Sequence, residues 1–164
     1  MTIQKIQKEL RKYASKERAK TNAWFFKTGK GQYGYGDVFI GVSNPDARKV
    51  ALENIDTPLS EIVLLLNSKI HEDRFVALEI LVFQYEKAVK QKDLSLQKKI
   101  VSFYLKNKDR INNWDLVDTS ASYILGSYLF DKDREVLYRL VKSKNLWHRR
   151  IAVIATHYFI KQKE

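Results

Sequence analysis

Apolar residues recur at helical spacing along almost the whole chain, and this spacing limits the possible fold more than any other feature. Ile3, Ile6, Leu10 and Tyr13 follow one another at steps of 3, 4 and 3 residues, which places them on one stripe of a helix. Later segments of about 10–18 residues show the same pattern and are joined by short polar turns. No convincing strand pattern interrupts them. We therefore predict an all-α protein.

Capping residues and prolines mark several helix starts. Asn44 before Pro45, and Thr57 before Pro58, each combine an N-cap residue with a proline of the first turn. Further helices are expected to begin near His71, Asp93, Asn113, Asp131 and Asn145.

The one long non-helical stretch is "KTGKGQYGYGDVFIGVSNP", which holds five of the six glycines. It contains no Gly-Lys-Ser/Thr and follows no strand, so it does not match a phosphate-binding loop. We interpret it as an ordered surface loop with a short extended piece at "DVFIGV".

A weak internal repeat indicates how the helices are arranged. "DRFVALEILVFQYEKAV" from Asp73 and "RRIAVIATHYFIKQ" from Arg149 share an arginine that opens an apolar run ending in aromatic residues and lysines. Arg74 and Arg150 are 76 residues apart, about twice the period of a HEAT-type helix pair. The pattern favours an α-α superhelix of HEAT-like pairs, with helices near 71, 113 and 145 lining one surface. A compact helical bundle is the alternative.

The formal net charge of +11 is unevenly placed along the 164 residues. Residues 1–30 hold nine lysines and arginines against two glutamates, and residues 131–164 hold nine against four acids. Residues 31–83 are acidic by four. A basic excess at both ends creates a directional field that suits nucleic acid. A basic protein without such a partner would show the same total charge.

Several functional classes have no support in the sequence. The absence of cysteine excludes disulfides and thiolate metal sites, and the three histidines form no metal-ligand pattern. There is no serine-nucleophile motif and no apolar run long enough to span a membrane, and the amphipathic, charged segment "MTIQKIQKEL" is unlike the apolar region of a secretory leader. We therefore expect a cytoplasmic protein with no metal and no cofactor.

The stretch "NNWDLVDTS" places two carboxylates and a tryptophan together, with no lysine or arginine among them. In a helix, Trp114 and Asp118 share one face, so that the indole lies beside the carboxylate. Such a pair can stabilise a cationic sugar transition state and orient a water molecule. The plainer interpretation is that Trp114 belongs to the core and that Asp115 sits in a first helical turn, where the dipole favours acids.

Two further sets could contact phosphate. In "NLWHRRIAV", Trp147, Arg149 and Arg150 lie near a helix start, where arginines oppose the dipole unless an anion is present. Asn44 and Arg48 form a capped helix start with an arginine one turn later. Solvated arginines and an ordinary helix start are the alternatives.

Three segments, in this order, resemble the HEAT-repeat DNA alkylation-repair glycosylases, the bacterial alkylpurine DNA glycosylases of the D type. They are "FFKTGKGQYGYGDVFIGVSNPDARKVA", "NNWDLVDTSASYILG" and "LWHRRIAVIATHYFIK". The similarity runs from about Trp24 to Lys161. Members of that family usually continue into further helices, one of which supplies a second tryptophan. We therefore expect residues 1–164 to form a single HEAT-like domain that lacks those C-terminal helices.

The resemblance implies a monomeric DNA N-glycosylase whose concave basic face wraps duplex DNA. Such enzymes excise cationic N3- or N7-alkylated purines without flipping them. By resemblance, Asp118 is the catalytic carboxylate and Trp114 the aromatic residue that packs on the deoxyribose. The positions expected to contact DNA are Arg150, Arg149, Trp147, Asn44 and Arg48. Asp115 is expected to be structural, and Asp118 to be a lone acid on a basic surface.

Two other functions fit the same residues. One is a helical-repeat protein that binds nucleic acid without catalysis, and the other is a protein-interaction scaffold. Binding to nucleic acid would weaken steeply as salt rises, whereas binding by a scaffold need not.

Overall fold

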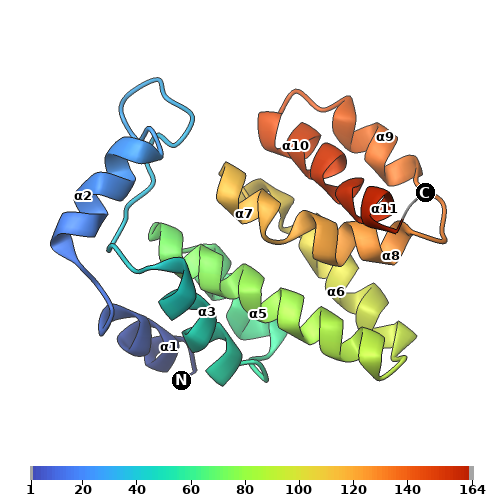
Figure 1. Ribbon diagram of the computed structural model, residues 1–164, viewed down its shortest axis with the longest axis horizontal. Coiled ribbons are helices and arrows are strands. Elements are labelled where there is room, and N and C mark those ends of the chain that lie inside the picture. The colour runs from blue at the N-terminus through green and yellow to red at the C-terminus, as the bar shows by residue number, and fades with distance from the viewer. Residues whose placement is uncertain (1, 163–164) are drawn as a thin grey trace. The chain divides into compact units, whose positions relative to one another are not determined.

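The computed structural model describes residues 2–162, and every regular element in that range is a helix (Figure 1). The all-α prediction is confirmed. Among the described residues, β structure is limited to an isolated parallel bridge between Val38 and Ile70, within the loop expected to hold a short extended piece. The chain divides into two compact units, Met1–Ile80 and Leu81–Glu164. Within each unit the helices pack against one another, in agreement with the predicted superhelix of helix pairs.

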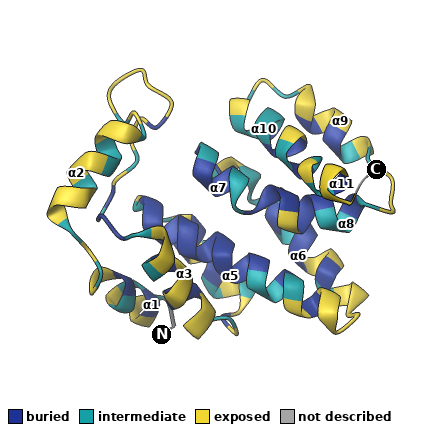
Figure 2. Cartoon of the chain, viewed as in Figure 1, coloured by how far each residue is buried: buried dark blue, intermediate teal, exposed yellow. Residues whose placement is uncertain are grey.

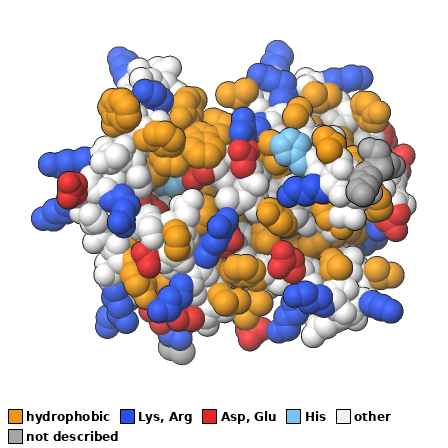
Figure 3. Space-filling model, in the orientation of Figure 1, with side chains coloured by type: hydrophobic (Ala, Val, Ile, Leu, Met, Phe, Trp, Pro, Cys, Tyr) orange, Lys and Arg blue, Asp and Glu red, His pale blue; other side chains and the backbone are white. Residues whose placement is uncertain are grey.

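The first unit contains α1 (Thr2–Arg11), α2 (Lys16–Phe25), α3 (Asn44–Glu53), α4 (Leu59–Leu66) and the first half of α5 (His71–Lys90). α1 packs against α3 and α4, and its stripe buries Ile6 and Leu10 completely. The first ten residues of α5 are all buried, whereas α2 is largely exposed (Figure 2). Hydrophobic side chains remain at the surface over α2 and the loop that follows it (Figure 3).

The second unit holds the rest of α5 and the remaining helices. These are α6 (Leu94–Lys106), the 3₁₀ turn η1 (Lys108–Arg110), α7 (Trp114–Asp118), the π-helix η2 (Ser122–Gly126), α8 (Ser127–Leu129), α9 (Glu135–Val141), α10 (Leu146–Ala155) and α11 (His157–Lys161). α10 packs against α7, η2 and α9, while α6 and α11 also contact η2. The core is built by apolar side chains such as Ile100, Leu116, Ile124 and Ile151.

Capping explains most of the helix starts. Asp93, Asn113 and Asn145 each cap a helix through the side chain, as predicted. The prediction that Asn44 caps α3 is wrong, because the hydroxyl of Ser43 accepts a first-turn N–H instead and Asn44 becomes the first helical residue.

Two other starts also differ from the prediction. Thr57 does not cap α4, because its hydroxyl donates to the Asn54 carbonyl at 2.7 Å and closes the preceding turn. α4 begins at Leu59 without a side-chain cap. α9 begins at Glu135 rather than near Asp131, since the intervening residues form the connection after α8. No helix in the described part of the chain is long and apolar enough to cross a membrane.

Candidate functional site

α7 places Trp114 and Asp118 one helical turn apart, as predicted. The side chain of Asn113 accepts the Trp114 N–H at 2.8 Å, so the helix begins at Trp114, and it ends at Asp118. Both side chains are half-buried. Between them, Asp115 is buried and its Oδ1 accepts the Leu116 N–H at 2.8 Å, which agrees with a structural role.

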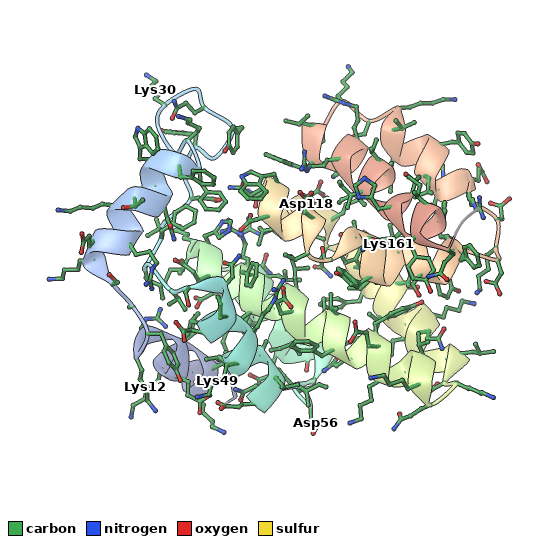
Figure 4. All side chains as sticks on the ribbon, viewed as in Figure 1. Lys12, Lys30, Lys49, Asp56, Asp118 and Lys161 are labelled. Atoms are coloured by element: carbon green, nitrogen blue, oxygen red, sulfur yellow. The ribbon has the colours of Figure 1, made fainter. Side chains whose placement is uncertain are left out.

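Arg150 of α10 binds the carboxylate of Asp118. Asp118, labelled in Figure 4, lies at the end of α7. Nε donates to Oδ1 at 2.8 Å and Nη2 donates to Oδ2 at 2.7 Å, which makes the pair bidentate. These hydrogen bonds raise the pKa of the Arg150 guanidinium, and partial burial opposes that shift. The expectation of a lone acid is wrong, because an arginine neutralises it. The acid is not sealed in the interior, since its side chain is 33% exposed.

A chain of hydrogen bonds fixes α7 against α6. Tyr104 is fully buried, and its hydroxyl lies 3.0 Å from Ser120 Oγ, which in turn donates to the Leu116 carbonyl at 2.6 Å. Burial raises the pKa of Tyr104, so this hydroxyl remains a donor. The π-helix η2 begins four residues after the end of α7, and π-helical turns occur frequently at functional sites.

Protein groups partner the basic side chains at the start of α10. His148 lies 2.8 Å from the Asp109 carboxylate through Nε2 and 3.0 Å from the Ser143 hydroxyl through Nδ1. Arg149 donates to the carbonyls of Ser143 and Lys144 at 2.8 and 2.9 Å. The conflict between the Arg149 guanidinium and the helix dipole is thus reduced within the unit itself.

The other residues proposed to bind DNA lie on α3 and at the start of α10. Asn44 and Arg48 are both exposed, one turn apart on α3. Arg48 donates to the buried carboxylate of Glu79 at 3.1 Å. The side chain of Trp147 is half-buried, and its backbone N–H donates to Asn145 Oδ1. The structure therefore groups Trp114, Asp118 and Arg150 in the second unit, whereas Asn44 and Arg48 belong to the first.

Comparison with known families decides the assignment. The model of the DNA alkylation repair enzyme family matches residues 6–164. The chain belongs to the DNA alkylation repair enzyme family. A search of curated proteins finds no match. Membership in the family indicates a role in DNA repair and a DNA substrate.

In this member of the family, the internal repeat coincides with a pair of arginine–aspartate contacts that the sequence reasoning missed. Arg74 donates to Asp37 Oδ1 at 2.6 Å, just as Arg150 binds Asp118. Arg74 and Arg150 occupy equivalent positions in the two copies of the repeat. This equivalence was the sequence signal that the two arginines could have similar partners, and each binds an aspartate. Exposure separates the pairs: the Arg74 side chain is 3% exposed and that of Arg150 is 38%.

Proposed function

We propose that the protein is a DNA glycosylase that hydrolyses the N-glycosidic bond of cationic N3- or N7-alkylated purines in duplex DNA, without flipping the base. The observation that carries the proposal is the Asp118 carboxylate. It is partly exposed, it is oriented by two hydrogen bonds from Arg150, and it lies one helical turn from Trp114. Family membership supports alkylated DNA as the substrate, and the net charge of +11 supports binding to its backbone.

The chemistry of a cationic purine reduces what the protein must supply. When the C1′–N bond breaks, the electron pair leaves with the purine and neutralises it, so no general acid is needed. Positive charge then develops on the sugar as an oxocarbenium-like ion. A water oxygen attacks C1′ and loses a proton, which yields the free alkylpurine and an abasic site. The protein has to stabilise a transient cation and hold a water molecule.

Asp118 and Trp114 fit these two tasks. A carboxylate about 4 Å from a unit positive charge gains about 4 kcal/mol at an effective dielectric constant of about 20. A carboxylate has about four lone-pair sites, and Arg150 takes two of them, which leaves acceptors for a water molecule and its proton. The π face of the Trp114 indole attracts the same cationic sugar.

Arg150 gives the proposed site a second state. In the free protein its guanidinium cancels much of the negative charge of Asp118. A DNA phosphate beside the lesion competes for the same bidentate donors, because arginine binds phosphate and carboxylate in the same geometry. When one of the two donors of Arg150 turns to the phosphate, the other still orients Asp118, and more of the negative charge of Asp118 becomes available to the sugar. Arg149, Trp147, Asn44 and Arg48 act as further backbone contacts in this proposal.

The test is release of free 7-methylguanine and 3-methyladenine from methylated duplex DNA under single-turnover conditions. We expect Asp118→Asn, which keeps the shape of the side chain, to lower the rate on the order of 100-fold. The matched control is Asp131→Asn, since Asp131 is an exposed acid of the same unit that pairs with Lys132 at 2.9 Å. Undiminished release by Asp118→Asn would remove Asp118 from the mechanism.

The ion pair with Arg150 offsets the negative charge of Asp118, and this favours one alternative function. In that alternative the protein is a family member that binds DNA but no longer catalyses base release. In that case the wild-type protein releases no base from methylated DNA. It still binds the duplex, and log K falls by about 0.9 per phosphate contact for each unit of log salt. The same two measurements therefore separate the enzyme from the binding protein.

A further inference from the structure

We propose that α2 and the loop after it form a second nucleic-acid contact, on which unpaired bases stack. We call Trp24, Phe25, Tyr33 and Tyr35 the aromatic platform. The platform belongs to the Met1–Ile80 unit, and the proposal does not depend on base excision by Asp118.

The platform exposes an unusual amount of aromatic surface. Trp24 is 72% exposed and Tyr35 66%, while Phe25 and Tyr33 are 53% and 43% exposed. No residue of α2 is buried. Large aromatic side chains grouped at a surface mark an interaction site more often than chance, whereas single exposed residues need no explanation.

Cations surround the rings. The exposed ones on α2 and the loop are Lys16, Arg18, Lys20, Lys27 and Lys30. Lys30 extends from the loop, as Figure 4 shows, and basic side chains border the hydrophobic surface of this region in Figure 3. The Nζ of Lys27 lies 4.7 Å from the centroid of the Trp24 ring, a cation–π contact. Aromatic rings can stack on the bases of one nucleic-acid strand, while neighbouring ammonium groups bind its phosphates.

Phe25 of the platform contacts an aromatic column that runs through the half-buried Phe26 into the core. Phe25 meets Phe26 edge-on at 5.3 Å, and Phe26 stacks on Phe39 at 4.9 Å. Phe39 stacks on His71 at 4.5 Å, and His71 lies 3.1 Å from the Asp37 carboxylate. Phe25 is thereby connected to the buried ion pair of Asp37 described above, which limits the movement of this ring.

The loop is also fixed at its other end. Glu72, which is buried, accepts the N–H groups of Ile40, Gly41 and Val42 at 2.8–3.3 Å. Gly41 has a φ of 78°, and a Cβ there would lie 2.1 Å from the Ser15 carbonyl at the start of α2. Only glycine fits this approach. A surface fixed in this way loses little conformational entropy on binding, which favours affinity.

Nucleic acid fits this surface better than a membrane does. A helix that lies in a lipid interface needs one apolar face, whereas Lys16 and Arg18 lie on opposite faces of α2 and its aromatic pair is at one end. Bases within a duplex stack on each other and expose only their edges in the grooves. Exposed aromatic rings therefore favour unpaired bases, as in other single-strand-binding surfaces.

The experiment compares two fluorescein-labelled ligands by anisotropy: an oligothymidylate of about 15 nucleotides and an oligomer of the same length made of abasic sites. The wild-type protein is expected to bind thymidylate more tightly. Trp24→Ala and Tyr35→Ala are each expected to weaken thymidylate binding about tenfold and to leave abasic binding unchanged. The control is Tyr138→Ala, since Tyr138 of α9 is also 68% exposed. It should alter neither affinity.

Three results would overturn the proposal. The first is equal affinity of the wild type for both ligands, and the second is an effect of Tyr138→Ala as large as that of Trp24→Ala. The third is binding to phosphatidylglycerol vesicles that depends on Trp24, with no such dependence for thymidylate. Circular dichroism verifies that each variant is folded. Thymidylate binding requires no excision of a base, so failure of either proposal can be recognised separately.

Discussion

Substituting Gly126 by alanine tests the packing that brings Arg150 to Asp118. Gly126 ends the π-helix and has helical torsion angles, with φ −60° and ψ −51°. A Cβ there would lie 2.2 Å from the Ala155 carbonyl oxygen and 2.9 Å from Tyr158 Cβ. Real Cβ atoms essentially never come closer than 3.0 Å to another heavy atom, so the backbone of α10 has to move away from η2.

Two effects of opposite sign decide the change in stability. Alanine is favoured over glycine inside a helix by about 1 kcal/mol. Forcing a methyl group into a packed helix contact costs about 1–3 kcal/mol, and the upper end applies because the atom in the way is backbone, not a movable side chain. We therefore expect Gly126→Ala to lower the free energy of unfolding by about 2 kcal/mol, which corresponds to about 4–8 °C in Tm for a chain of this size.

The assay is thermal and urea unfolding followed by circular dichroism, together with base release from methylated DNA. Arg150 and Ala155 share α10, so a shift of that helix is also expected to slow excision. The matched control is Gly29→Ala, whose Cβ would lie 2.8 Å from the end of the flexible Gln32 side chain and should be nearly neutral. A Gly126→Ala protein as stable as the wild type would show that α10 does not pack as described.

Three more substitutions probe other parts of the structure. Glu72→Gln weakens three hydrogen bonds from the backbone of residues 40–42. It should lower the free energy of unfolding by about 2 kcal/mol and weaken thymidylate binding. If neither quantity changes, Glu72 does not anchor the loop. Burial raises the pKa of Tyr85 from 10.0 to about 12. The unfolded chain therefore loses this proton first, and stability should fall between about pH 10 and pH 12. In Tyr85→Phe the urea midpoint should fall less over that range, and a fall equal to that of the wild type would argue against the burial. Arg150→Lys removes the bidentate grip on Asp118 and should lower the excision rate on the order of tenfold while changing Tm little, because the pair is partly exposed. A wild-type rate would argue against a positioning role.

Features that depend on a few neighbouring residues were the ones that the sequence could predict. Helical spacing and side-chain caps act within one or two turns, and Asp93, Asn113 and Asn145 cap helices as expected. The error at Asn44 has a local cause. Ser43 is an equally good cap, and adjacent candidates cannot be ranked without the path of the preceding loop.

The site could be predicted only in part, for a different physical reason. Trp114 and Asp118 lie within one helix, so their proximity follows from the helical repeat alone. Arg150 meets Asp118 across 32 residues, and Arg74 meets Asp37 across 37. Such pairs depend on which helices pack together, and no short-range pattern encodes that. The residues of the aromatic platform are visible in the sequence, but their exposure is a tertiary property.

The π-helical turn of η2 sets the rotational phase between α7 and α8. A π-helical turn contains about one residue more than an α-helical turn. In an α-helix, each residue rotates the chain by about 100° around the helix axis. Deleting a single residue between Ser122 and Gly126 would therefore leave a regular helix of similar length. The acid at the end of α7 would then point about a quarter of a circle away from its arginine. In comparisons among relatives, a one-residue gap at this place would signal loss of the paired carboxylate even where the aspartate itself is retained.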